Sequence, residues 1–195
     1  MSGPDRNLRG DAPVSPDMLV LCDLLSTFDF PGADRLVSTL TRVAPALHRL
    51  RASADRAGVP VVYVNDNIGA WRSDRSAVLS ALDEPGSNFP PALRCLLPRE
   101  DDFFLLKPKH SAFFGTPLGS LLHHLRSRRI VLCGMATEIC VLFTAHDAYL
   151  AGLEIVVPVD GVASTDGRAH AMALGLMRRA LKVRTPQSRS VRWRR

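Results

Sequence analysis

The chain has 195 residues, which suits one α/β domain with a sizeable core and does not require a second domain. Its net charge of +6 comes from the end of the chain, because the last eighteen residues hold eight basic and no acidic side chains, leaving 17 basic against 19 acidic in the other 177. The other 177 residues therefore carry no excess of positive charge, and we exclude a nucleic-acid-binding domain. With no long apolar run and no signal-peptide pattern, we expect neither a membrane span nor secretion, and we assign the protein to the cytoplasm.

Irregular segments are expected at both ends of the domain. Residues 1–16 are rich in Pro, Gly, Asp and Arg without periodicity, which predicts a mobile leader. The domain then spans residues 17–185, and residues 186–195 form a basic tail that we expect to be solvated or disordered.

Short apolar runs alternate with helical patterns along the domain. The runs predict buried strands at 18–22, 59–65, 103–106, 130–133 and 154–159, and an edge strand at 182–185. Helices are predicted over 36–57 with a break at Pro45, and over 77–82, 117–126, 138–151 and 168–181. This alternation favours a parallel sheet covered on both faces, that is, a three-layer α/β/α sandwich.

The stretch from residue 130 to 152 places a cysteine at the start of a helix. Gly134 ends the strand, Thr137 is a plausible N-cap, and Gly152 stops the helix, so Cys140 lies in the first turn. Unpaired N–H groups and the positive end of the helix dipole favour thiolate over thiol at that position. The alternative is a buried structural cysteine.

Polar side chains lie at or just after the carboxyl ends of four of the predicted strands: Asp23, Asn65, Lys107 and Cys140. In parallel sheets ligands bind beyond the carboxyl ends of the strands, so these groups are expected on one rim. Asp23 is able to take the thiol proton, Lys107 to stabilise the ionised groups, and Cys140 to attack an electrophilic carbon. The chain has 22 Arg but only three Lys. The choice of Lys at position 107 suggests that the site requires a compact ammonium group rather than a guanidinium group.

Three motifs in order resemble the isochorismatase-like cysteine hydrolases, which include nicotinamidases, N-carbamoylsarcosine amidohydrolases and ureidoacrylate hydrolases. They are GMATEICV (134–141), KPKHSAFFGTPL (107–118), and Asp23 with Phe28 five residues later. The resemblance covers most of residues 18–185. It implies a six-stranded parallel sheet between helices, assembled as a homodimer or homotetramer.

The resemblance also implies roles for single residues. Asp23, Lys107 and Cys140 would form a catalytic triad, the Met135–Ala136 peptide bond would be cis, and the backbone N–H groups of Ala136 and Cys140 would form an oxyanion hole.

Two positions depart from the family pattern. Leu25 stands where family members often have Gln. Asp66 matches the first residue of the nicotinamidase Asp-x-His metal site, but Ile68 stands where the His would be. One carboxylate does not hold a zinc ion. We therefore predict no metal and no cofactor, and the segment 65–74 resembles a metal-free branch.

The leading hypothesis is hydrolysis of a C–N bond in a small amide or ureido compound through a Cys140 thioester, with no nucleic-acid or membrane partner. Candidate pocket residues are Phe28, Asn65, Trp71 and Phe113. A second hypothesis is vinyl-ether hydrolysis with Asp23 as the acid and the cysteine dispensable. A third is a non-catalytic binding or assembly protein that works through its basic tail.

Overall fold

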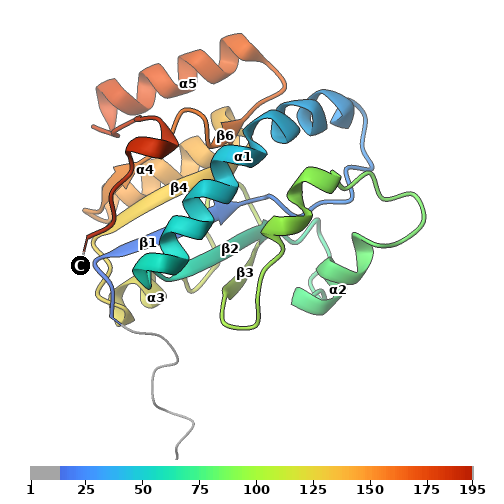
Figure 1. The fold of residues 1–195 in the computed structure, drawn as a ribbon, viewed down its shortest axis with the longest axis horizontal. Coiled ribbons are helices and arrows are strands. Elements are labelled where there is room, and N and C mark those ends of the chain that lie inside the picture. Colours follow the sequence, from blue (N-terminus) through green and yellow to red (C-terminus); the bar gives the residue numbers. More distant parts are fainter. Residues whose placement is uncertain (1–13, 195) are drawn as a thin grey trace, which may run out of the picture.

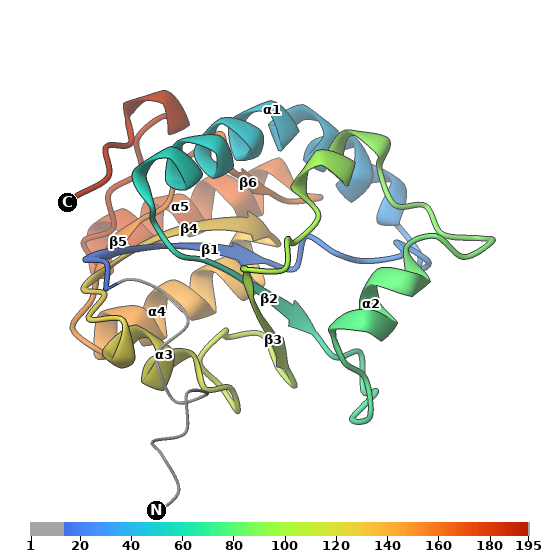
Figure 2. The same ribbon diagram turned by 60° about the horizontal axis from the view of Figure 1, so that its bottom comes forward.

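The computed structural model describes residues 14–194, so most of the expected leader, residues 1–16, lies outside the described part. A sheet of six parallel strands forms its centre, in the order β3-β2-β1-β4-β5 with β6 paired to β4 (Figures 1 and 2). The strands are β1 (Asp17–Cys22), β2 (Val61–Asp66), β3 (Phe103–Lys107), β4 (Arg129–Met135), β5 (Glu154–Val156) and β6 (Val162–Ala163). The predicted parallel sheet is therefore confirmed.

Helices cover both faces of the sheet. They are α1 (Ala33–Ala57), α2 (Arg75–Ala81), α3 (Leu118–His124), α4 (Leu142–Leu150) and α5 (Gly167–Ala180), with short helices η2 (Pro91–Leu96), η3 (Thr137–Val141) and η4 (Ser188–Ser190). Figure 2 shows α1 on one side of the sheet and α3 and α4 on the other. The three-layer sandwich predicted from the alternating pattern is correct.

Strand β1 lies at the centre and is buried along its whole length. Its side chains alternate, so that Leu19 and Leu21 join the core beneath α1 while Met18, Val20 and Cys22 join the core beneath α3, α4 and α5. Burial on both faces explains why the strand is a continuous apolar run rather than an alternating one.

The first helix continues through Pro45, where the sequence predicted a break. A proline within a helix removes the hydrogen bond to the carbonyl four residues earlier, here that of Thr41. Both Pro45 and Thr41 are exposed, so that carbonyl remains accessible to water. Leu40 and Leu47 are fully buried on either side, and this packing holds one continuous helix.

The sixth strand of the sheet is β6 rather than the predicted edge strand at 182–185. That segment makes one isolated bridge, between Arg184 and Val156, and the helix before it ends at Ala180. The edge-strand prediction is therefore wrong in its extent, although the segment does lie beside β5.

The basic tail packs on the domain, contrary to the expectation that it is solvated. Trp193 Nε1 donates to Ser53 Oγ on α1 at 2.9 Å, and its ring packs against the core beneath that helix. The backbone N–H of Arg194 donates to Asp17 Oδ2 at 2.7 Å. Figure 1 shows the end of the described chain, in red, beside the start of β1. Apolar and backbone contacts outweigh the solvation that the tail's charges favour.

No helix within residues 14–194 combines the length and the apolar character needed to cross a membrane.

Candidate functional site

The carboxyl ends of the central strands carry the predicted catalytic side chains. Asp23 follows β1, Lys107 ends β3, and Cys140 lies on η3 just after β4. Only glycine fits at position 134 of β4, because φ is 119° there and an added Cβ would lie 1.9 Å from the Cys22 carbonyl oxygen. This close approach of β4 to β1 brings the cysteine-bearing turn next to Asp23.

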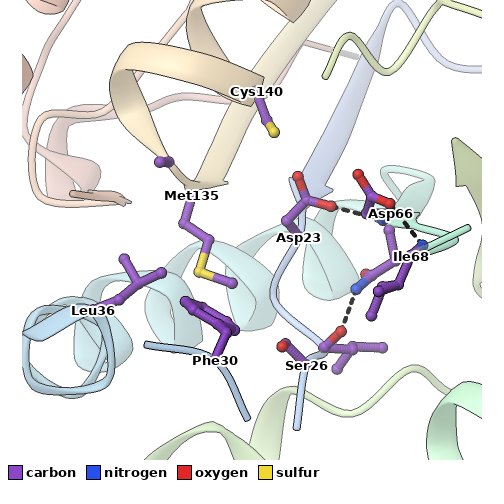
Figure 3. Close-up of a pocket in the computed structure, with 11 residues that line it drawn as sticks. Asp23, Ser26, Phe30, Leu36, Asp66, Ile68, Met135 and Cys140 are labelled. Atoms are coloured by element: carbon purple, nitrogen blue, oxygen red, sulfur yellow. Dashed lines mark hydrogen bonds between the residues drawn. The ribbon is translucent and has the colours of Figure 1, made fainter. Parts of the chain in front are cut away.

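Lys107 lies between the two other predicted catalytic groups. Its Nζ is 2.9 Å from Asp23 Oδ2 and 3.6 Å from Cys140 Sγ, and the side chain is 0% exposed. Figure 3 shows Cys140 and Asp23 directed toward the same space. The structure thus brings together the three residues that the sequence singled out.

A second carboxylate, which the sequence analysis treated only as the remnant of a metal motif, also approaches the lysine. Asp66 Oδ2 lies 3.5 Å from Lys107 Nζ. The register of β2 and β3 pairs Asp66 directly with Lys107, and this pairing is the signal that sequence reasoning lacked.

Asp23 is held in a fixed orientation. Its φ is 54°, and its Oδ1 accepts a 2.8 Å hydrogen bond from the backbone N–H of Asp66. Burial raises the pKa of Asp23 above its ordinary value, while the charge of Lys107 works in the opposite direction. A carboxyl group with a raised pKa is suited to both accepting and returning a proton.

The ammonium group of Lys107 stays charged. Burial by itself lowers the pKa of Lys107, but the nearby Asp23 carboxylate and the Cys22 and Cys140 thiols raise the net pKa well above its ordinary value. A permanent positive charge beside the cysteine sulfur stabilises a thiolate electrostatically.

The turn that carries Cys140 differs in detail from the prediction. Residues Thr137–Val141 form a π-helical turn, and Ala136 rather than Thr137 occupies the N-cap position. Thr137 is buried, and its Oγ1 donates to the Ala163 carbonyl at 3.0 Å, so it ties the turn to β6 instead of capping the helix. The Met135–Ala136 peptide bond before it is cis.

A cavity of about 370 Å³ opens over these groups. Its wall is made by Asp23, Leu25, Ser26, Phe30, Leu36, Asn65, Asp66, Ile68, Met135, Ala136 and Cys140. Phe30, Leu36 and Met135 form an apolar side, shown together in Figure 3. Cys140 and Ala136 therefore border the same space, as the oxyanion-hole interpretation requires.

Of the four predicted pocket residues, only Asn65 lies in this wall. Phe28 is 1% exposed and packs in the core beneath α1, and its neighbour Phe30 reaches the cavity instead. Phe113 packs in the core on the other side of the sheet. Trp71 is 79% exposed and borders an adjacent hollow of about 400 Å³. The sequence identifies the segment after β1 as part of the cavity wall, but not that Phe30 rather than Phe28 faces the cavity.

No group of three or more His, Cys, Asp or Glu side chains within residues 14–194 is arranged to hold a metal ion. Asp66 faces Lys107, and Ile68 beside it offers no ligand atom.

Comparison with known proteins identifies the family. Residues 17–188 match the family described as Isochorismatase domain. The chain belongs to the isochorismatase family. As a member of this family it is a hydrolase.

This isochorismatase-family chain is 34% identical over 163 residues to the uncharacterized family protein YaaI of Bacillus subtilis, covering 84% of this chain and 89% of YaaI. It superimposes on N-carbamoylsarcosine amidase from Thermoplasma acidophilum with a TM-score of 0.66 and 26% identity, covering 90% and 98% of the two chains. The nicotinamidase SaPncA from Staphylococcus aureus shares the fold, with a TM-score of 0.67, 23% identity and coverage of 89% and 98%.

Proposed function

We propose that this hydrolase cleaves a C–N bond of a small amide or ureido compound through a thioester on Cys140. One observation carries the proposal: the fully buried Lys107 ammonium contacts both Asp23 (2.9 Å) and Cys140 (3.6 Å) beside a cavity that both residues border. A thiol, a proton acceptor and a fixed positive charge are what nucleophilic attack by sulfur requires.

In the first step, Asp23 takes the proton of the Cys140 thiol and the sulfur attacks the substrate carbonyl carbon. A C–S bond forms, and the carbonyl oxygen becomes an oxyanion. The backbone N–H groups of Ala136 and Cys140 are the donors proposed to hold that oxyanion, and one such donor is typically worth about a hundredfold in rate.

In the second step, Asp23 returns the proton to the departing nitrogen, the C–N bond breaks, and an acyl thioester remains on Cys140. Water then attacks the thioester with Asp23 as base, releasing the carboxylic or carbamic acid and restoring the thiol. The raised pKa of Asp23 favours this shuttling role because its two protonation states lie closer in free energy at neutral pH.

The cavity limits the substrate to a small molecule. Its volume of about 370 Å³ lies near the lower end for ligand pockets, and Phe30 and Met135 give it an apolar side. The exposed Trp71 is proposed to contact the part of a substrate that extends past Asp66 and Ile68, since these two residues border both hollows.

A homo-oligomer is also part of the proposal. Several large apolar side chains are exposed on η3, α4 and α5, namely Ile139, Phe143, Met172 and Leu176. Clustered exposed apolar side chains are characteristic of protein interfaces.

A second candidate is hydrolysis of a vinyl ether, in which Asp23 donates a proton to the substrate and sulfur takes no part. The observation that favours it is the raised pKa of Asp23, which increases the protonated fraction of this carboxyl group.

Replacement of the cysteine separates the two candidates. Cys140→Ala is assayed against small amides, ureido acids and vinyl ethers, with Cys95→Ala as a matched control because Cys95 is an exposed free thiol outside the cavity wall. Amide turnover that is lost in Cys140→Ala and kept in Cys95→Ala supports the thioester route. Vinyl-ether turnover that survives in Cys140→Ala supports the vinyl-ether route. If the wild-type protein turns over none of these compounds, a non-catalytic role is favoured.

A further inference from the structure

The turn that carries Cys140 has no side-chain cap of its own. Its N-cap residue, Ala136, makes no side-chain hydrogen bond, because alanine has no polar side-chain atom. The turn is held from outside through Thr137, which is 0% exposed and whose Oγ1 donates to the Ala163 carbonyl oxygen at 3.0 Å. Ala163 belongs to β6 and pairs with Met135 at the end of β4. This contact therefore ties the turn to the strand that precedes it.

A second contact to the same hydroxyl group comes from α5. His170 Nδ1 lies 2.9 Å from Thr137 Oγ1. A hydroxyl group has one hydrogen, and Thr137 donates it to Ala163, so Thr137 Oγ1 accepts the hydrogen bond from His170 and Nδ1 carries a hydrogen. Burial lowers the pKa of His170 below its ordinary value, so the ring is mainly neutral at pH 7 and Nε2 carries no hydrogen.

The histidine is itself held in a fixed place. The Asp166 side chain caps α5 by accepting hydrogen bonds from two backbone N–H groups of its first turn, at 2.7 and 3.1 Å. The backbone N–H of His170 donates to the Asp166 carbonyl oxygen at 2.9 Å. Strand β6 ends at Ala163, three residues before this cap. Both groups that hold the Thr137 hydroxyl therefore come from one short, ordered segment of the chain.

We propose that His170 is a positioning residue for the nucleophile: its hydrogen bond to Thr137 fixes the turn that carries the Cys140 sulfur and the proposed oxyanion donors. This inference rests on the proposed thioester mechanism. Thr137 directly follows Ala136 and precedes Cys140 by three residues, so a displacement of Thr137 moves the sulfur and both donors. Neither His170 nor Thr137 lines the catalytic cavity, so neither is placed to contact the substrate. The effect of His170 is therefore expected in kcat rather than in KM.

The test replaces His170 by Leu and by Asn and measures kcat and KM for the small primary amide that the wild type turns over fastest. Leu removes the donor, so kcat is expected to fall about tenfold or more with KM within about threefold, because small misplacements of reacting groups are costly in rate. Asn carries an N–H donor near the position of Nδ1, so its kcat is expected to stay within about threefold of the wild type. An unchanged kcat in His170→Leu overturns the proposal. An equal fall in both variants also overturns it, because the packing of the ring then explains the loss.

His124→Leu is the matched control. His124 is exposed on α3 and lies outside the cavity wall, so its replacement is expected to leave kcat unchanged. A fall as large as that of His170→Leu contradicts the assignment to His170. If His170→Leu does not fold, His170→Gln takes its place, since the longer side chain carries its donor near the position of Nε2 instead of Nδ1. Equal kcat values in His170→Gln and His170→Asn then overturn the proposal.

The hydrogen bond is also measured without a substrate. Nitrogen-15 chemical shifts of the His170 ring near neutral pH are expected to show the Nδ1–H tautomer in the wild type and a shifted Nδ1 signal in Thr137→Val. An Nε2–H tautomer, or an Nδ1 signal that Thr137→Val leaves in place, overturns the inference. Cys140-dependent turnover that is unaffected in His170→Leu refutes only this inference, whereas the absence of any Cys140-dependent turnover refutes the proposed function itself.

Discussion

Replacing Lys107 by Met tests the electrostatic account of the site. The substitution keeps an unbranched apolar stem and removes the positive charge from a side chain that is 0% exposed. It deletes the 2.9 Å ion pair with Asp23, whose side chain is only 12% exposed. Removing one partner of a buried pair typically costs about 3–5 kcal/mol, and the lower end, about 3 kcal/mol, applies here because Asp23 borders an open cavity.

The cost is expected to depend on pH. Burial already raises the pKa of Asp23, and Lys107 opposes that rise, so the variant should raise the pKa further. A folded-state pKa above the unfolded value means that the folded protein binds the proton more tightly. The resulting stability is fully present below the unfolded pKa of about 3.9 and is lost as the pH rises through the folded pKa. Lys107→Met is therefore least destabilising in acid.

Urea unfolding at about pH 5 and about pH 7.5 measures this dependence for the wild type, Lys107→Met, Asp23→Asn and the double variant. We expect a loss of about 3 kcal/mol for Lys107→Met near pH 7.5, a smaller loss near pH 5, and a smaller loss in the Asp23→Asn background at either pH. An equal loss at both pH values and in both backgrounds would mean that the cost comes from packing alone and not from the charge of Lys107.

Three further perturbations test the fold around the site. Gly134→Ala places a Cβ 1.9 Å from the Cys22 carbonyl oxygen at a φ of 119°, so we expect no folded protein on circular dichroism, whereas Gly152→Ala, with open space around it, should fold with a loss of about 1 kcal/mol. Burial raises the pKa of Tyr63 to about 12, so the wild type should lose about 2 kcal/mol of stability between pH 10 and pH 12 that Tyr63→Phe does not lose; identical pH profiles would contradict this. Trp193→Ala removes a half-buried ring packed on the core, with an expected loss of about 2 kcal/mol in urea unfolding, and an unchanged midpoint would show that the tail contributes nothing.

The sequence predicts the sheet and the meeting of the three candidate site residues because both depend on strong local patterns. Apolar runs that end in a polar residue mark the carboxyl ends of parallel strands, and Asp23, Lys107 and Cys140 each stand at such an end. The structure brings Asp23 and Cys140 within hydrogen-bonding distance of the Lys107 ammonium group.

The details that the sequence did not predict depend on tertiary packing. A proline inside a helix usually breaks it, but burial of the leucines on either side of Pro45 keeps α1 continuous. Thr137 has the residue type of an N-cap, yet its hydroxyl finds the Ala163 carbonyl, which no local pattern reveals. Phe28 and Phe30 stand two residues apart, and only the path of the chain after β1 determines that Phe30 faces the cavity.

The charge pattern of the tail likewise did not predict that the tail packs on the domain. Its four arginines and lack of acidic residues favour a solvated segment, and the sequence contains no local signal for its docking. The contacts of Trp193 with Ser53 and of Arg194 with Asp17 join positions more than a hundred residues apart. The local periodicity of a sequence does not predict contacts between positions so far apart.

The central claim is that Cys140 carries the acyl group during turnover. The most direct measurement is acid quenching of the wild-type protein during turnover of a small primary amide or its ester, followed by intact-mass analysis and peptide mapping. We expect an adduct of the acyl mass on the peptide that contains Cys140, no adduct on the peptides that contain Cys22, Cys95 or Cys133, and no adduct in Cys140→Ser. Sustained turnover with no adduct on Cys140, or an adduct on another cysteine, would contradict this claim.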